Sequence, residues 1–377
     1  MAKAPIDDQA SPDEIYETLI RSLRRRKGFG LVFVNCTPVR GTQLIEEIRR
    51  DLPQKQVGVM ALTEPVETLR DLVAAKADIA ELNILVITGL EKSLEADIKP
   101  GYGGNGDYYN LNTVPPILAH LNQQRENFRD RFDHLCFVFL LPIYAIKYIV
   151  RRAPDFFDWG TGVVELPTDE ETTERKSGQL FGDYHQYLTW TQTERDRRIL
   201  QIQTWLAECK DNAIRQSELF FEQGNLFAAS QRLEEAIASY DKAIAFKPDM
   251  HKAWSNRGLS LDDLGRREEA IASYDKAIAF RPNMHEAWSN RGVSLDDLGR
   301  REEAIVSYDK ALEFKPDFSS AMYNKACSLS LMGDRDGALE WLKKAIALDA
   351  KYREMAKTDE DFSELRDDPR FQKLVQL

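Results

Sequence analysis

Four residues of the N-terminal half have the types and spacing to hold a phosphate group and its metal ion: Arg40, Gly41, Thr42 and Glu91. A guanidinium pairs with phosphate oxygens, and a hydroxyl together with a carboxylate can organise Mg²⁺. The first three residues follow the apolar run Leu31–Asn35, and Glu91 follows the apolar run Leu82–Thr88. If both runs are parallel strands, their carboxyl ends share one edge of a sheet, which is where such sheets bind ligands.

The stretch Asn35–Thr42 lies where a phosphate-binding loop of the form GxxxxGK[ST] would be, but it departs from that pattern. Asn35 and Arg40 stand at the two glycine positions, and Gly41 stands at the lysine position. Such a loop needs glycines so that backbone N–H groups can surround the phosphates, and lysine to neutralise them. Thr88 stands where an aspartate usually organises the metal ion. We therefore expect neither catalysis nor a cofactor here; the alternative is ATP with Mg²⁺.

A second set of candidate residues is a carboxylate pair that occurs twice, as Asp262-Asp263 and Asp296-Asp297. Both pairs lie within a block, Met250–Asn283, that recurs with only seven differences as Met284–Asp317. The offset is 34 residues, which is the period of a two-helix solenoid unit. The sequence therefore predicts stacked helical repeats that present these carboxylates at regular intervals.

Each repeat contains apolar residues at the spacing of two helices. Trp254, Gly258 and Leu261 mark the first helix, and Ala270 and Tyr274 mark the second. The block resembles the tetratricopeptide repeat in its residues Trp254, Gly258, Ala270, Tyr274, Ala277 and Pro282, and again in Trp288, Gly292, Ala304, Tyr308, Ala311 and Pro316. The resemblance implies an all-α superhelical solenoid.

Steps of 34 residues extend the array to four repeats, over residues 217–250, 251–284, 285–318 and 319–352. The fourth repeat has Ala350 where the proline is expected, so the array is expected to end there. Residues 353–377 are predicted to be a capping segment whose Phe362, Leu365 and Phe371 pack on the last repeat, because exposed repeat ends need a cap. Residues 168–216 are predicted to be a linker with connecting helices.

The resemblance also implies which side chains face a partner, because the first helix of each repeat lines the inner surface. The implied contacts are Lys252, Ser255, Leu259, Asp262, Asp263, Glu286, Ser289, Val293, Asp296, Asp297 and Tyr323. The basic residues that clamp a peptide's terminal carboxylate in chaperone-binding members are missing from most of these positions. An acidic groove with small and apolar residues suits a protein or peptide that carries a basic segment. The alternative is that the four aspartates are solvated helix ends.

The N-terminal domain, residues 1–167, is predicted to be α/β. Apolar runs of strand length alternate with helical patterns, which indicates a parallel five-stranded sheet with helices on both faces. The predicted strands are 31–35, 56–62, 82–88, 135–141 and 162–166, and the predicted helices include 42–51, 67–77, 114–130 and 143–152. Over residues 25–167 the layout resembles the STAND and AAA-like branch of P-loop NTPases in order and position, with degenerate motifs.

A helix is predicted to begin after Ser11, where Ser11 and Glu14 form a capping box, and to end near Arg26. Its end carries the basic run Arg24–Lys27. Cations are favourable at a helix C-terminus, so the run is expected to be a solvated helix end; the alternative is a site for an anionic ligand.

Composition excludes several classes of protein. A net charge of −11 and a pI near 5.2 argue against nucleic-acid binding, which usually uses a basic face. The four cysteines show no pairing or metal spacing and are expected to be reduced thiols, and no apolar run is long enough to cross a membrane. We therefore expect a cytoplasmic protein with no nucleic-acid or membrane partner, and self-association stays open.

Together these patterns predict a non-enzymatic adaptor or scaffold that binds a partner protein or peptide through its repeats. The alternative is a STAND-type signalling switch in which the α/β domain binds nucleotide and the repeats act as a sensor.

Overall fold

A computed structural model describes residues 11–101, 108–109, 113–209 and 211–376. It divides into two compact units, residues 1–211 and 212–377, each of which is described separately. None of the described helices is both long and apolar enough to cross a membrane.

Unit 1 contains an all-parallel five-stranded sheet, as the apolar runs predicted. In spatial order its strands are β2 (Val57–Ala61), β3 (Ile84–Thr88), β6 (Cys136–Leu141), β1 (Gly30–Asn35) and β7 (Gly160–Glu165). Strand β1 pairs with β6 from Gly30 opposite Cys136 to Asn35 opposite Leu141. The neighbours β3, β6 and β1 therefore end at the same edge of the sheet.

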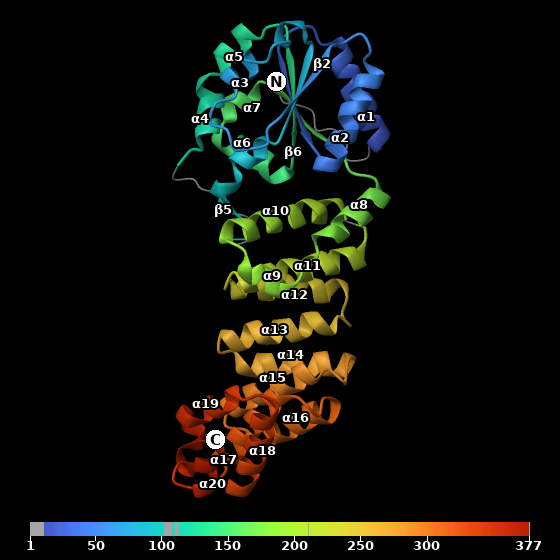
Figure 1. Ribbon diagram of the computed structural model, residues 1–377. Helices are drawn as coiled ribbons and strands as arrows, with labels where there is room; N and C mark the ends of the chain where they lie inside the picture. The colour runs from blue at the N-terminus through green and yellow to red at the C-terminus, as the bar shows by residue number, and fades with distance from the viewer. Residues whose placement is uncertain (1–10, 102–107, 110–112, 210, 377) are drawn as a thin grey trace. The chain divides into compact units, whose positions relative to one another are not determined.

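Helices cover both faces of this sheet (Figure 1). One face carries α1 (Pro12–Arg25) and α2 (Pro38–Asp51). The other carries α3 (Arg70–Ala74), α4 (Pro116–Gln123), α5 (Arg125–Arg131), α6 (Ile143–Arg152) and α7 (Pro154–Asp158). Successive residues of β1 point to opposite faces, so Val32 and Val34 pack on the first layer and Phe33 packs on the second. Short elements complete the layer: η1 (Ile79–Glu81), η2 (Leu90–Ser93), η3 (Glu95–Asp97), β4 (Ile98–Lys99) and β5 (Tyr108–Tyr109).

Three predicted helices in unit 1 differ from those observed. Helix α2 begins at Pro38 instead of residue 42, because the Thr37 side chain caps it and Pro38 has the backbone geometry of a first helical residue. The helix predicted over 67–77 is reduced to α3, and a separate 3₁₀ turn, η1 (Ile79–Glu81), follows it. The helix predicted over 114–130 is divided into α4 and α5 at Gln124, whose backbone leaves the helical region.

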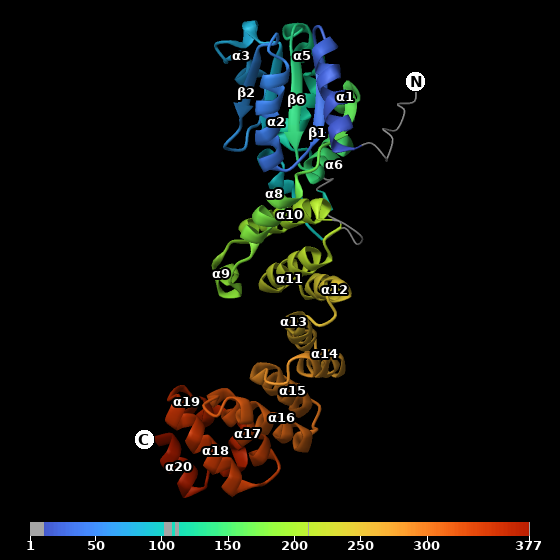
Figure 2. The ribbon, with the colours of Figure 1, turned by 90° about the vertical axis from the view of Figure 1, so that its right-hand side faces the viewer.

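The segment predicted as a linker lies largely in unit 1. It forms α8 (Glu170–Ser177), η4 (Gly178–Leu180), α9 (Tyr184–Thr189) and α10 (Gln192–Glu208). Leu200 of α10 belongs to the hydrophobic core beneath α6. The Arg197 guanidinium pairs with Glu95, which follows β3, at 2.8 Å. Helix α10 therefore lies against the carboxyl edge of the sheet (Figures 1 and 2).

Unit 2 is entirely helical and consists of helix pairs. The pairs are α11 (Ala213–Ala229) with α12 (Leu233–Phe246), α13 (His251–Asp263) with α14 (Arg267–Phe280), α15 (His285–Asp297) with α16 (Arg301–Phe314), and α17 (Ser319–Leu331) with α18 (Arg335–Leu348). The chain then forms α19 (Lys351–Thr358), η5 (Glu360–Leu365) and α20 (Pro369–Gln376).

A glycine and a tyrosine set the close packing within each of the first three repeats. A Cβ atom at Gly258 would lie 2.5 Å from the Tyr274 ring, and a Cβ atom at Gly292 would lie 2.5 Å from the Tyr308 ring. Tyr274 is completely buried. The repeated glycine is therefore required for the two helices of a repeat to approach each other.

Candidate functional site

The carboxyl edge of the sheet brings together the loops in which a nucleotide site is predicted. Burial raises the pKa of the Cys36 thiol to about 12, and both the Arg40 and the Glu91 charges act on it, lowering and raising the pKa respectively. Arg40 follows β1 and Glu91 follows β3, so both lie at the carboxyl edge of the sheet, with β6 between their strands.

The local structure at this edge differs from a phosphate-binding loop. Residues Arg40, Gly41 and Thr42 lie in the first turns of α2, and the backbone N–H groups of Arg40 and Gly41 donate to Thr37 Oγ1 and O. The Arg40 side chain pairs with Glu47 at 2.9 Å. The donors and the positive charge that phosphates would need are thus used within α2 itself.

The other predicted nucleotide residues are also engaged or enclosed. The Thr42 hydroxyl donates to the Pro38 carbonyl at 3.0 Å, and Gly41 is buried, with a Cβ there placed 3.2 Å from the Leu140 side chain. Glu91 Oε2 is buried without a hydrogen-bond partner among the described residues, and burial raises the pKa of this carboxyl.

Helices α8 and α10 contribute further groups at this edge. The hydroxyl of Thr168, two residues before α8, is hydrogen-bonded to the Thr37 hydroxyl at 2.7 Å. The backbone N–H of Thr168 donates to the carboxylate of Glu208, the last residue of α10, at 2.7 Å. The chain itself therefore covers the position at which parallel sheets usually bind a ligand.

In unit 2 the first helices of successive repeats, α11, α13, α15 and α17, each contact the next, whereas the second helices come less close to one another. The first helices therefore line the more tightly curved side of the array. We call the predicted partner-contacting residues of α13, α15 and α17 the first-helix face.

Two of the predicted contact aspartates hold neighbouring repeats together. Asp262 accepts hydrogen bonds from the Tyr274 hydroxyl of its own repeat at 2.8 Å and from the Ser294 hydroxyl of the next repeat at 2.7 Å. Asp296 accepts from Tyr308 and Ser328 in the same way. Burial raises the pKa of both aspartates, and the hydroxyl donors partly oppose that effect.

Three other residues predicted to contact a partner are buried, so the prediction is wrong for them. Ser255 and Ser289 are 3 % and 4 % exposed, because position five of each first helix points into the packed array. Tyr323 is 4 % exposed because the C-terminal segment covers it. These side chains do not belong to the exposed part of the first-helix face.

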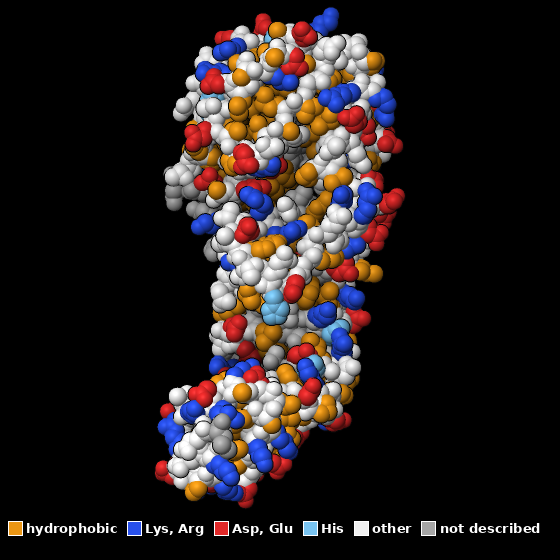
Figure 3. Space-filling view, viewed as in Figure 1, with side chains coloured by type: hydrophobic (Ala, Val, Ile, Leu, Met, Phe, Trp, Pro, Cys, Tyr) orange, Lys and Arg blue, Asp and Glu red, His pale blue; other side chains and the backbone are white. Residues whose placement is uncertain are grey.

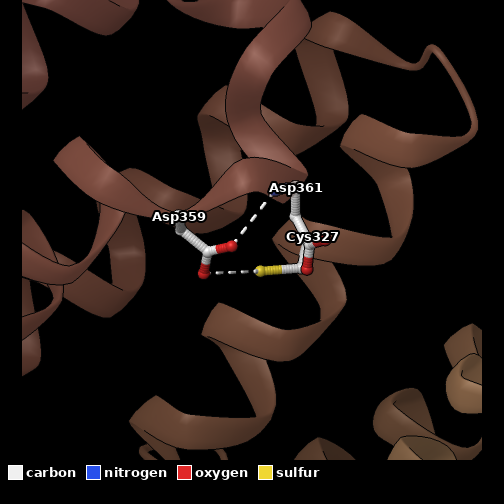
Figure 4. Close-up of side chains that lie close together, drawn as sticks. All are labelled: Cys327, Asp359 and Asp361. Carbon is white, nitrogen blue, oxygen red and sulfur yellow. Dashed lines mark hydrogen bonds between the residues drawn. The ribbon is translucent and has the colours of Figure 1, made fainter.

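The C-terminal segment binds back onto the first helix of the fourth repeat (Figure 4). The Tyr323 hydroxyl donates to Asp359 at 2.6 Å, and the Cys327 thiol lies 3.9 Å from the same carboxylate oxygen. The tail is held by the burial of Phe362, Leu365 and Phe371, which the sequence predicted.

Cys327, Asp359 and Asp361 bring a thiol and two carboxylates within 4.8 Å of one another. Burial and the two aspartates raise the pKa of the Cys327 thiol well above its usual range. A metal ligand must be a thiolate, and these groups are already joined by hydrogen bonds, so the cluster is a contact between the tail and α17.

What stays exposed on the first-helix face occupies the same three positions in two consecutive repeats: a charged residue of opposite sign in the two repeats, an apolar residue and an aspartate. We call it the open stripe: Lys252, Leu259, Asp263, Glu286, Val293 and Asp297. Leu259 and Val293 are 43 % and 38 % exposed, so an apolar side chain reaches solvent at the same position of both repeats. Asp297 pairs with Arg267 at 2.7 Å, whereas Asp263 has no ion pair among the described residues.

On the side that Figure 3 shows, basic and acidic side chains alternate over the last repeat and tail.

The serines that bind Asp262 and Asp296 were missed by the sequence analysis. Ser294 and Ser328 occupy the same position in their repeats, and Ser260 occupies it in the preceding repeat. All three are at most 2 % exposed. A polar residue that recurs every 34 positions beside apolar ones was a signal that could have identified them.

Comparisons with known proteins agree with the repeat architecture. Family models described as tetratricopeptide repeat match residues 221–285, 285–318 and 319–352. This part of the chain therefore consists of tetratricopeptide repeats. No curated protein matches the sequence.

Solved structures with similar folds include MamA, at 21 % identity and a TM-score of 0.39, which covers 50 % of this chain and 98 % of its own. A second is YrrB, titled a TPR protein with an unusual peptide-binding site, at 21 % identity and a TM-score of 0.40, covering 51 % of this chain and 99 % of its own. A third is the first TPR of Spaghetti bound to an HSP90 peptide, at 23 % identity and a TM-score of 0.32, covering 32 % and 95 %.

Proposed function

We propose that this protein is a cytoplasmic adaptor that binds a partner protein or peptide through the open stripe of its tetratricopeptide repeats. The observation that carries the proposal is the exposure of Leu259 and Val293 at equivalent positions of adjacent first helices. Solvent-exposed apolar residues in register, flanked by charges, are typical of a surface that covers a segment of another chain.

The charges of the open stripe favour a partner with a basic segment that also offers an apolar side chain. Asp263 and Asp297 lie at the same position of successive repeats, four residues after Leu259 and Val293. A lysine or arginine of the partner would lie beside these carboxylates while its apolar neighbour covers the leucine or valine. Lys252 at one end and Glu286 in the next repeat would set the direction of the bound segment.

The buried side chains define the limits of this surface. At the C-terminal end the tail already covers Tyr323 and Cys327, so the open stripe ends before the fourth repeat. At the N-terminal end Asn225 takes the position of Leu259 and is buried, where it accepts hydrogen bonds from Tyr240 and Asn256. The partner segment is therefore expected to span two repeats.

In this proposal the α/β unit is a folded domain without catalytic activity. The nucleotide-switch alternative gains no support at the sheet edge, because the donors of Arg40 and Gly41 bind Thr37 and the Arg40 charge binds Glu47. We propose that no cofactor binds at this edge of the sheet.

A peptide selection on the full chain tests the proposed function. Random peptides of about twelve residues would be selected against the purified protein, and the selected peptides would be titrated by fluorescence anisotropy. The proposal predicts enrichment of lysine or arginine beside an apolar residue, and at least about tenfold weaker binding to Leu259→Lys/Val293→Lys. Val306→Lys, a substitution at an exposed apolar residue of α16, is the matched control. Peptides that bind the stripe variant as well as wild type would place the binding surface elsewhere.

A further inference from the structure

A surface hollow at the end of α1 has the lining of an anion-binding site. It has a volume of about 590 Å³ and is lined by Thr18, Arg21, Ser22, Arg25, Arg26, Lys27 and Phe29. Four of these residues are cations, two are hydroxyls and one is an aromatic ring. No carboxylate lines it.

The geometry of α1 explains why these groups converge. Thr18, Arg21, Ser22 and Arg25 follow one another at intervals of three and four residues, so they share one face of the helix. The opposite face holds Leu19, Ile20 and Leu23, which are buried against the sheet. The sheet therefore fixes the helix in an orientation that points its arginines and hydroxyls outward together.

The cations of the hollow lack the partners that other surface arginines have. In the part of the chain that the structure describes, Arg21, Arg25, Arg26 and Lys27 form no ion pair. Arg49 and Arg50, at the end of the neighbouring helix α2, pair with Glu46 at 3.2 Å and Asp51 at 2.7 Å. Glu17 is placed one turn before Arg21 without forming a pair with it, and Glu14 is used by the capping box.

Helix geometry alone accounts for only part of this cluster. The negative end of the helix dipole favours Arg24 and Arg25 in the last turn. It does not account for Arg21 one turn earlier, nor for Arg26 and Lys27 beyond the helix. Four like charges that surround one hollow in a chain of net charge −11 repel one another, and a bound anion would relieve that repulsion.

The chemical types of the lining residues specify the anion. Arginine forks match the oxygens of phosphate with two hydrogen bonds each, and the Ser22 hydroxyl can donate one more. The Thr18 hydroxyl already donates to the Glu14 carbonyl at 2.8 Å. Phe29 forms a fixed apolar wall, because its ring is held edge-on by Phe137 and Trp159, each with a centroid 6.0 Å away. The volume is that of a small-molecule site.

We infer that the hollow beside α1 binds a small phosphate-bearing molecule, with the phosphate on Arg21 and Arg25 and any organic part against Phe29. The site lies where α1 leads into the start of β1. It is therefore at the amino edge of the sheet, opposite the edge at which a nucleotide site is predicted from the sequence. It is independent of the peptide-binding role of the repeats.

The test is a calorimetric titration of the full chain with inorganic pyrophosphate, and in a second arm with ADP, without added metal ion and at constant ionic strength. We expect one site per chain that binds pyrophosphate. Arg21→Gln/Arg25→Gln should weaken this binding about a hundredfold, because each arginine contributes about a factor of ten. Tighter binding of ADP than of pyrophosphate would identify an ester with an organic part as the ligand, and equal binding would identify free polyphosphate.

The matched control is Arg49→Gln/Arg50→Gln, which removes the same charge from the neighbouring helix. It should leave pyrophosphate binding within about twofold of wild type, because these arginines have their own carboxylates. In the absence of ligand, Arg21→Gln/Arg25→Gln should melt no lower than wild type, since it removes repulsion. No binding of pyrophosphate, or an equal loss in the control variant, would overturn the proposal.

Discussion

Asp262 and Asp296 illustrate how a repeated surface motif can serve the interior of a repeat array. Each carboxylate accepts hydrogen bonds from a tyrosine of its own repeat and a serine of the next. Each therefore helps to fix the relation between two repeats. Their neighbours Asp263 and Asp297 are one position further along the helix and are exposed; Asp297 pairs with Arg267, whereas Asp263 has no ion pair among the described residues.

The buried aspartates should give the stability of unit 2 a distinctive pH dependence. Burial raises their pKa in the folded state, so the folded protein holds these protons more tightly than the unfolded chain. Their stabilising contribution is complete below the unfolded pKa of about 3.9 and is lost as pH rises through the folded pKa. Asp262→Asn/Asp296→Asn keeps acceptors for the hydroxyls but does not ionise.

The free energy of unfolding of wild type relative to this asparagine variant should therefore fall as pH rises from about 4 to about 7. Urea unfolding of the full chain at several pH values measures the difference, and taking the difference removes the effect of groups common to both proteins. A difference that is constant or rises with pH would show that the two carboxylates do not titrate as their burial requires.

Gly258 offers a second test at the residue scale. Gly258→Ala would place a Cβ atom 2.5 Å from the Tyr274 ring and should destabilise unit 2 by ~1–3 kcal/mol through overpacking. Leu259→Ala, at an exposed neighbour on the same helix, should change stability by less than about 0.5 kcal/mol. Denaturant unfolding of both variants compares them directly. An equal effect of the two substitutions would contradict the packing described.

At the scale of elements, the strands and the repeat helices could be predicted from the sequence because both depend on local pattern, whereas the order of the strands in the sheet could not. Apolar runs at strand length gave β1, β2, β3, β6 and β7, and the period of 34 residues gave the helix pairs. The start of α2 was wrong by one turn, because Thr37 as a capping residue outweighed the expected loop. Because residues 35–42 were compared with a phosphate-binding loop, Thr37 and Pro38 were not interpreted as the start of a helix.

Other features depend on contacts between distant segments and could not be predicted from local pattern. The apolar residues of α10 indicated a helix, but nothing near Leu200 showed that it would pack beneath α6 at the sheet edge. The apolar residues of the tail that were predicted to be buried are buried. The hydrogen bond between Tyr323 and Asp359 could not be predicted, because it depends on the path by which the tail folds back onto α17. The candidate binding surface stays a prediction; the burial of Ser255, Ser289 and Tyr323 removes these residues from it and leaves the open stripe exposed.

The tail should contribute strongly to the stability of the last repeat. Phe362 is fully buried and lies against Tyr323 and Phe371, with ring centroids 5.7 Å apart in each case. Phe362→Ala should destabilise unit 2 by ~3–5 kcal/mol, because the loss of the ring leaves a cavity. Thermal unfolding compared with Met355→Ala, an exposed residue of α19, measures the effect. A loss no larger than that of the control would show that the tail is not packed.

At the scale of the whole molecule, the two candidate phosphate sites can be separated by thermal melts with and without millimolar Mg·ATP. If ATP binds in the α1 hollow, the shift in melting temperature should disappear in Arg21→Gln/Arg25→Gln and persist in Thr42→Ala, because the Thr42 hydroxyl binds Pro38 within α2. A shift that disappears on Thr42→Ala and persists in the arginine variant would instead establish the sheet edge as the nucleotide site and support a switch.

If the open stripe binds a basic peptide segment, reversing the charge of its aspartates should weaken that binding. The measurement is the dissociation constant of one selected lysine- or arginine-containing peptide for wild type, Asp263→Lys/Asp297→Lys and Glu302→Lys/Glu313→Lys. The last variant makes the same change in net charge on α16. We expect at least about tenfold weaker binding for the first variant and less than about twofold change for the second. Equal dissociation constants for wild type and Asp263→Lys/Asp297→Lys would contradict this expectation.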